Sequence, residues 1–277
     1  GGLATFMAMA YIIFVNPAIL AEAGIPFQDA LVATCLAAGL ATLAMGLYAD
    51  YPLALASGMG LNAVLVYTVV KGQGLSWQVG MGLIVLEGLL VTALVLTGLR
   101  EQVMNAIPLP IKRAIGVGIG LFIAFIGLKN GGFVTAHPAT LVTFGDFASR
   151  PVGVAAAGLL LTGWMLSRRV TGASLWGMLA TAALAIFAGV AKPPATWLAA
   201  PSLPSTLFQA DLAGAFRLSL LPLVFAFFMV DFFDTMGTVI AVGGQGGFLR
   251  PDGTLPRLKR VLLVDSLAAV LGGAFGA

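Results

Sequence analysis

The sequence predicts an all-α polytopic membrane protein, because it is very apolar, because its apolar runs have the length of membrane spans, and because it is rich in glycine. Of the 277 residues, 60% are hydrophobic and 9% are charged, whereas roughly a quarter of the residues are charged in an ordinary soluble domain. Runs of about twenty apolar residues, enough to cross a bilayer as a helix, recur along the whole chain. The 36 glycines favour closely packed membrane helices.

Nine apolar runs are expected to form membrane spans. Most connections between them are short, and the two long ones, 129–150 and 192–216, have a composition that suits ordered loops or short interfacial helices. The chain begins with Gly-Gly and ends within an apolar run, so we expect a fragment of a longer protein. The expected spans are 2–21, 30–48, 53–70, 77–98, 112–128, 151–167, 172–191, 217–242 and 259–277.

Basic residues are divided unevenly between the two sides of the expected bundle. Nine of the 14 Lys and Arg residues lie in or beside the loops that follow spans two, four, six and eight, and five lie on the other side. Cytoplasmic loops carry an excess of Lys and Arg, so we expect these four loops and the N-terminus in the cytoplasm. The nine residues are Arg100, Lys112, Arg113, Arg168, Arg169, Arg250, Arg257, Lys259 and Arg260.

The third expected span is interrupted near its middle by Ser57, Gly58 and Gly60. Interrupted helices in transporters present backbone groups and the positive end of a half-helix to a cavity near the bilayer midplane. Asn62 is expected at the start of that half-helix, where its amide offers both donors and an acceptor to an uncharged heterocyclic ligand. An interhelical hydrogen bond from Asn62 is the structural alternative.

The eighth expected span carries a polar stripe. Asp231, Asp234, Thr235 and Thr238 share one helix face, because they lie three, four and seven residues apart. Lipid accommodates such a stripe poorly, so the helix is expected to line a cavity. Two carboxylates one turn apart repel each other when both are ionised, so one of them should hold a proton. The alternative is that both acids cap or bridge neighbouring helices.

Two further acids lie inside expected spans. Glu87, in the fourth span, is a candidate for proton coupling together with Asp231 and Asp234, although a structural role is the alternative. Asp265 lies five residues beyond Arg260, so it is interpreted as part of an ion pair that reaches the cytoplasmic interface.

Two reactive side chains are given no functional role. Cys35 lies in an apolar run, and a single cysteine forms neither a disulfide nor a cysteine-based metal site within this chain. His137 lies in a polar connection with no partner acid or second His near it, and is interpreted as a solvated loop histidine. The basic residues are scattered over short loops, which argues against nucleic-acid binding. No metal, nucleotide or redox cofactor is implied.

Four blocks of sequence occur in order along the chain: Met9–Pro17, Gly58–Ala63, Ile119–Asn130 and Asp231–Thr238. Through these blocks, and over nearly all of its length, the sequence resembles the AzgA-like adenine, guanine and hypoxanthine permeases of the nucleobase:cation symporter (xanthine/uracil permease) family. The resemblance implies fourteen spans in two inverted repeats of seven, arranged as a core bundle and a gate bundle. This chain would hold the first nine spans.

The resemblance also implies an assignment of residues. Within a single transporter domain, 1–277, core helices are expected at about 2–98 and 217–277 and gate helices at about 112–191. By motif, Asn62 matches the binding residue of the third span and Asp234 matches the acid of the eighth span that contacts the base. Asp231 has an accessory position, and the remaining binding candidates are Gly60, Thr235 and Thr238. A third site element, on the tenth span, would lie beyond Ala277.

The function implied is proton-coupled uptake of purine bases across the plasma membrane by alternating access, and not enzymatic catalysis. The implied partners are the purine substrate and the lipid bilayer, and a homodimer is compatible with this interpretation. A uracil, xanthine or anion permease of the same architecture is the first alternative, although the acid pair argues against an anion. An intramembrane aspartyl protease needs acids on separate helices, usually with a Gly-x-Gly-Asp element, and here Leu61 follows Gly60. A passive channel, the third alternative, would ordinarily show a repeated pore ring or a pore loop, and nothing in this sequence demands one.

Overall fold

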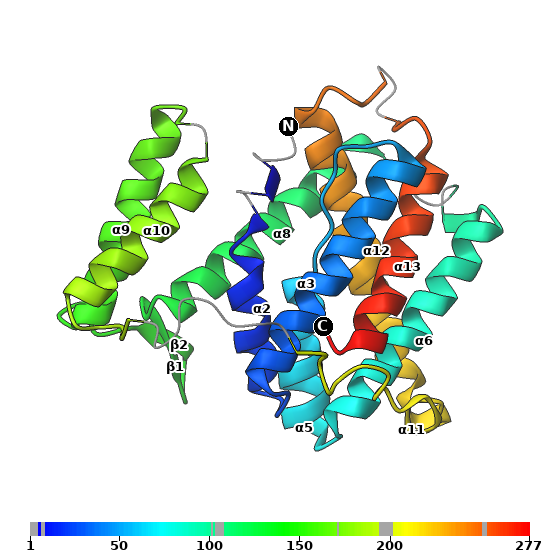
Figure 1. The fold of residues 1–277 in the computed structure, drawn as a ribbon, viewed down its shortest axis with the longest axis horizontal. Helices are drawn as coiled ribbons and strands as arrows, with labels where there is room; N and C mark the ends of the chain where they lie inside the picture. Colours follow the sequence, from blue (N-terminus) through cyan, green and yellow to red (C-terminus); the bar gives the residue numbers. More distant parts are fainter. Residues whose placement is uncertain are drawn as a thin grey trace. The chain divides into compact units, whose positions relative to one another are not determined.

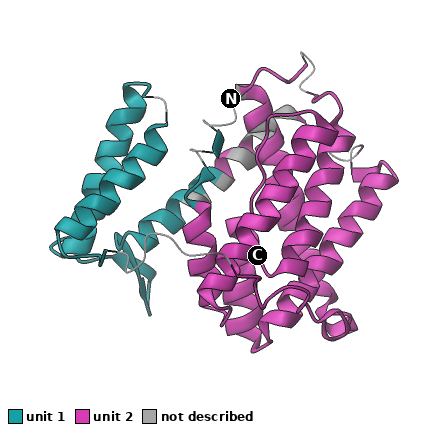
Figure 2. Ribbon diagram, viewed as in Figure 1, with its two compact units in different colours: residues 1–11, 120–200 teal, residues 12–119, 201–277 magenta. Residues whose placement is uncertain are grey.

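The computed structural model describes residues 5–6, 9–100, 102, 108–170, 172–193, 202–250 and 254–277. It is mainly helical (Figure 1) and divides into two compact units (Figure 2). Unit 1 comprises Gly1–Tyr11 and Gly120–Ala200, and unit 2 comprises Ile12–Ile119 and Pro201–Ala277. These boundaries fall near the expected division between core and gate, but the identity of the two units with those bundles stays a prediction.

Unit 2 contains the first helices of the chain and the last two long ones. Its helical segments are α2 (Ile12–Ala21), α3 (Phe27–Ala44) with its π-helical continuation η1 (Met45–Ala49), α4 (Met59–Ala63) with its π-helical continuation η2 (Val64–Val70), α5 (Lys71–Gln73), α6 (Trp77–Leu96), α11 (Leu212–Ala215), the 3₁₀ turn η3 (Leu218–Leu220), α12 (Leu221–Gln245) and α13 (Leu258–Phe275).

Helices α6 and α13 form the most extensive helix contact of unit 2. Glycine allows this close approach on both sides. A Cβ on Gly88 would lie 2.8 Å from Val270 Cγ2, and a Cβ on Gly273 would lie 2.8 Å from Val85 Cγ2. Small residues at such contacts let helix backbones approach each other closely. The glycine enrichment seen in the sequence therefore serves helix packing here.

The third expected span is broken, as its glycines predicted. Residues 50–58 are not helical, and the helix begins at Met59, with Gly58 as its N-cap. The Thr42 hydroxyl of α3 holds the non-helical segment, because it accepts a hydrogen bond from the Leu55 amide (3.0 Å) and donates one to the Leu55 carbonyl (3.3 Å). The prediction of a half-helix that starts just before Asn62 is confirmed.

Unit 1 contains a helical pair and a β-hairpin. The part of helix α8 (Leu109–Asn130) from residue 120 onwards belongs to it. Helices α9 (Arg150–Ser167) and α10 (Ala173–Phe187) pack together, with Gly158 facing Thr181 and Gly177 facing Thr162. Strands β1 (Val134–His137) and β2 (Leu141–Phe144) pair antiparallel, with Val134 opposite Phe144.

The hairpin corrects the expectation of a purely α-helical fold, because residues 129–150 were expected to form loops or interfacial helices. Val, Thr and Phe residues are typical of strands, and a turn over residues 138–140, which begins with Pro138, separates the two arms. His137 Nδ1 accepts hydrogen bonds from the backbone amides of Ala139 (3.2 Å) and Thr140 (3.3 Å). The imidazole ring of His137 therefore orders the turn of the hairpin.

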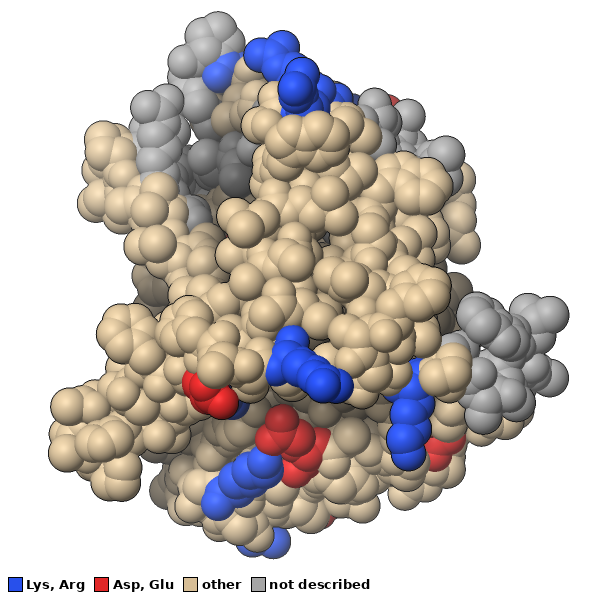
Figure 3. Space-filling view, turned by 90° about the vertical axis from the view of Figure 1, so that its left-hand side faces the viewer, with Lys and Arg blue, Asp and Glu red and all other residues tan. Residues whose placement is uncertain are grey.

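Among the described residues, three helical stretches are long and apolar enough to cross a membrane: Phe27–Ala49, Trp77–Leu96 and Leu218–Gly244. Each of the nine expected ranges contains a helix, but nine spans stay a prediction. In the first range the continuous helix begins at Ile12, and residues 1–4 and 7–8 lie outside the described part, as do 194–201 of the second long connection. On the face drawn in Figure 3, charged side chains are sparse, which suits a protein surrounded by lipid.

Candidate functional site

The start of helix α4 is tied to helices α2 and α3 by buried amides. Asn62 Nδ2 donates a hydrogen bond to Asn16 Oδ1. Asn16 Nδ2 in turn donates to Thr34 Oγ1 (2.8 Å) and Ser57 Oγ (3.3 Å). The Asn16, Thr34 and Asn62 side chains are all buried. The interhelical hydrogen bond that was the alternative role of Asn62 is therefore present, and it uses the amide nitrogen while the amide oxygen accepts no hydrogen bond from another described residue.

Asp234 of α12 lies at the start of the same half-helix. Its Oδ2 is 3.3 Å from the position that a Cβ on Gly58 would take. Gly58 is the N-cap of α4, so the carboxylate lies where the first backbone N–H groups of a helix have no intrahelical acceptor. Asp234 is half-buried and makes no hydrogen bond or ion pair with another described residue. Its oxygens are therefore available to a ligand.

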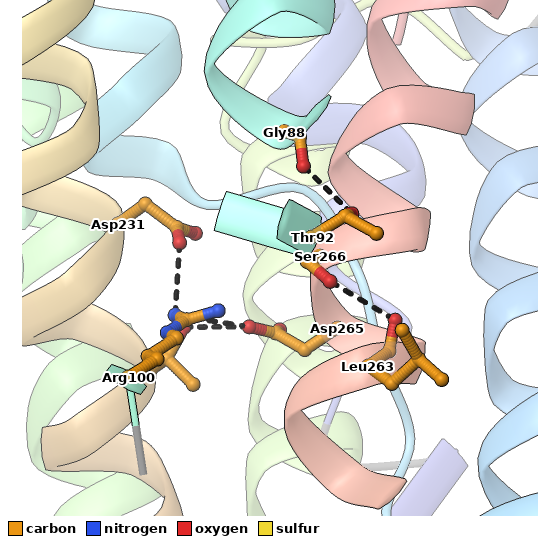
Figure 4. A network of polar contacts seen from close by, with 8 residues as sticks. Gly88, Thr92, Arg100, Asp231, Leu263, Asp265 and Ser266 are labelled. Atoms are coloured by element: carbon orange, nitrogen blue, oxygen red, sulfur yellow. Dashed lines mark hydrogen bonds and ion pairs between the residues drawn. The ribbon is translucent and has the colours of Figure 1, made fainter. Parts of the chain in front are cut away.

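Asp231, one turn earlier on α12, has a very different environment. Its Oδ2 lies 3.0 Å from Arg100 Nη2, and the same nitrogen lies 3.6 Å from Asp265 Oδ2 of α13 (Figure 4). The Thr235 hydroxyl donates a hydrogen bond of 2.7 Å to that Asp265 oxygen. The stripe of α12 therefore divides, because Asp231 and Thr235 take part in an ion-pair network whereas Asp234 faces α4.

Two side chains of this network differ from the sequence-based expectation. Arg100 was counted as a loop charge, but its side chain is completely buried, because two carboxylates compensate its charge. Asp265, five residues after Arg260, was expected to form an ion pair at the cytoplasmic interface. Its carboxylate pairs with the buried Arg100 instead. The Arg260 guanidinium lies 5.7 Å from the ring centre of Tyr48. Without Arg100, the division of basic residues is eight to five.

Glu87 of α6 is buried in the same interior, with 1% of its surface exposed. Neither of its carboxyl oxygens has a hydrogen-bond partner among the described residues, and the same holds for Arg100 Nε and Nη1. Glu87 interacts electrostatically with Asp231, Arg100 and Asp265. The three acids that were named as proton-coupling candidates thus occupy one unit of the structure but differ in their partners.

The remaining binding candidates are placed less specifically. Gly60 lies in the first turn of α4 and is partly exposed, and Thr238 is exposed on α12. Sequence reasoning missed Asn16 and Arg100 as members of these networks. An Asn directly before Pro17 inside an apolar helix was a usable signal for Asn16. Within the described part of the chain, no group of His, Cys, Asp and Glu residues is arranged to hold a metal ion.

A broken membrane helix with an unpaired acid at its start, next to buried ion pairs, is typical of membrane transporters. The chain matches the family described as Permease family (Xan_ur_permease) over residues 1–277, and it belongs to this xanthine/uracil permease family. It is similar to the guanine/hypoxanthine permeases PbuG (43% identity over 288 residues) and PbuO (41% over 281) of Bacillus subtilis. It is also similar to the adenine permease AdeP of Escherichia coli (38% over 275).

These alignments cover 100%, 99% and 99% of the chain and 65%, 65% and 62% of the respective relatives. The chain therefore spans less than two thirds of the length of these curated relatives. Membership of a family of transporters, and not of enzymes, agrees with the resemblance identified from the four sequence blocks. Together with the apolar helices it defines an integral membrane protein.

Proposed function

We propose that this chain is part of a permease that carries adenine, guanine or hypoxanthine into the cell across the plasma membrane in symport with protons. The observation that carries the proposal is the carboxylate of Asp234, which no described residue pairs, beside Gly58 at the start of the half-helix that contains Asn62. A carboxylate accepts hydrogen bonds from ring N–H groups, and the free Asn62 oxygen can accept another. The relatives named as purine-base permeases support this substrate class.

Proton coupling is supported by the surplus of acids in unit 2. Glu87 is buried without a hydrogen-bond partner among the described residues, and a buried carboxylate of this kind is very unfavourable unless it gains a proton or a counter-charge. Asp231 and Asp234, one turn apart, are the other candidates for proton coupling.

We propose that alternating access exposes these groups to each side of the membrane in turn. In this proposal the N-terminus lies in the cytoplasm, unit 2 is the core bundle and unit 1 is the gate bundle.

Uptake of radiolabelled bases by the full-length protein tests this proposal. In cells without their own purine transporters, hypoxanthine, guanine or adenine should accumulate, and an agent that collapses the proton gradient should abolish accumulation. Unlabelled adenine, guanine and hypoxanthine should compete, and uracil and xanthine should not. Accumulation of uracil or xanthine in their place would favour the alternative permease, and uptake that only equilibrates with the medium would contradict symport.

A further inference from the structure

Arg100 is the largest completely buried side chain of the described residues. It follows helix α6 by four residues, and its guanidinium lies between α12 and α13 (Figure 4). A guanidinium inside a membrane protein is very unfavourable unless carboxylates compensate it. Its burial therefore points to a specific role for its partners.

The contacts of Arg100 distinguish the two acids of the α12 stripe. Its Nη2 lies 3.0 Å from Asp231 and 3.6 Å from Asp265, and Thr235 fixes Asp265 with a hydrogen bond of 2.7 Å. Asp234 has no ion pair with a described residue. One cation thus engages Asp231 and leaves Asp234 free.

We propose that Arg100 is a positioning residue for the candidate site: it supplies the counter-charge that holds Asp231 beside Asp265, and so leaves Asp234 as the carboxylate of α12 that meets the substrate. The inference deepens the proposed function and rests on it for the identity of the substrate. Nothing in the sequence pattern assigned this role, because Arg100 resembled an ordinary basic residue in a cytoplasmic loop.

The charges around Asp231 explain why Arg100 is needed. Glu87 and Arg100 face Asp231 from the α6 side, Asp265 faces it from α13, and Asp234 lies on its own helix. Arg100 is the one cation that the described residues place beside Asp231. Without Arg100, Asp231 is an uncompensated carboxylate one turn from Asp234. It then repels the Asp234 carboxylate and competes with it for the N–H groups of the purine base. A proton on Asp231 or an amide in its place would remove this competition.

The test uses the purified full-length protein, equilibrium binding of radiolabelled hypoxanthine and adenine, and the unfolding temperature. Arg100→Gln should lower the affinity at neutral pH by about tenfold or more, and this defect relative to wild type should shrink at mildly acidic pH. Arg100→Gln with Asp231→Asn should regain part of the lost affinity at neutral pH, because only Asp265 then lacks its counter-charge, and it should gain less at acidic pH than Arg100→Gln alone. Arg100→Lys, which keeps the charge, should lie between wild type and Arg100→Gln.

Arg260→Gln is the matched control, because Arg260 is an exposed arginine of the same unit that stacks on Tyr48, and it should leave the affinity unchanged. Wild-type affinity in Arg100→Gln would overturn the proposal, and so would a folded Arg100→Gln variant whose defect neither acidic pH nor Asp231→Asn relieves. If wild type binds none of the purine bases, the proposed function fails. The ion pair of Arg100 with Asp231 is then tested by the unfolding temperature alone. Arg100→Gln should lower this temperature, and adding Asp231→Asn should raise it again.

Discussion

The Asp234 carboxylate lies 3.3 Å from the point where a Cβ on Gly58 would sit. This approach joins α12 to the non-helical segment before α4, two parts of the chain that are distant in sequence. Gly58 has φ −73° and ψ 115°, a conformation that any residue can adopt. The glycine is therefore needed for space and not for its backbone angles.

Gly58→Ala in the full-length protein tests this contact directly. The added methyl group is too close to Asp234 for an ordinary van der Waals contact, so the carboxylate or the start of α4 must shift. We expect base affinity to fall by about three- to tenfold, with little change in the unfolding temperature. Gly39→Ala on α3, where nothing lies within 4 Å of the new Cβ, is the control. Equal affinities for the two variants would show that the approach is unimportant for binding.

Asp234→Asn should have the strongest effect on substrate binding. A hydrogen bond to a charged group is worth about 1.5–3 kcal/mol, so the affinity for hypoxanthine or adenine should fall about ten- to a hundredfold. Asp231→Asn should be milder, because Asp265 still pairs with Arg100, and Asp234→Glu should keep weak function. Uptake is measured in vesicles at several external pH values, with surface expression in parallel. Normal expression and a wild-type pH dependence in Asp234→Asn would remove this residue from the site.

Asn62→Ala and Asn16→Ala should separate binding from folding. Asn62→Ala should lower uptake more than the amount of protein in the membrane, because it leaves polar groups of the buried substrate unpaired at about 1–3 kcal/mol. Asn16→Ala should mainly reduce the amount of protein and its unfolding temperature, because Asn16 contacts Thr34, Ser57 and Asn62. If both variants lower abundance equally and neither changes binding, Asn62 has only the structural role.

Glu87→Gln should uncouple proton movement from substrate binding. The amide keeps the size of the side chain and removes the titratable group, and the unfolding temperature should stay the same or rise because the oxygens have no partner among the described residues. Equilibrium binding should persist, and accumulation driven by a pH gradient should decrease. Glu22→Gln is the control, since Glu22 forms an exposed ion pair with Lys71, which contributes little. Wild-type accumulation in Glu87→Gln would assign coupling to the aspartates.

Cysteine labelling tests the orientation of the chain. In a cysteine-free background that includes Cys35→Ala, a cysteine in place of Arg169, between α9 and α10, should react with a membrane-impermeant maleimide only after the cells are opened. A cysteine in place of Thr140, at the exposed turn of the hairpin, should react in intact cells. The reverse pattern would invert the topology that the basic residues predict.

Local features of the fold could be predicted, and distant pairings could not. Ser57, Gly58 and Gly60 showed where the third helix breaks, because glycine and serine lower the helix propensity at their own positions. The face shared by Asp231 and Asp234 followed from helix periodicity. Neither pattern indicates which group approaches a side chain from another helix, so the division of that face between Arg100 and Gly58 appeared only in the structure. Alternation at 134–144 could have revealed the hairpin, but the polar, proline-containing context suggested a loop.

Arg100 and Asp231 lie 131 residues apart in the chain, and this separation has a consequence for biosynthesis. At translation rates of about 5–20 residues per second, roughly 7 to 26 seconds pass between the synthesis of the arginine and that of its partner. During this interval the insertion machinery handles α6 with a cation beside it that has not yet met its carboxylates, and Asp265 follows later still. The close contact of α6 with α12 and α13 is therefore a late event in the maturation of the nascent chain.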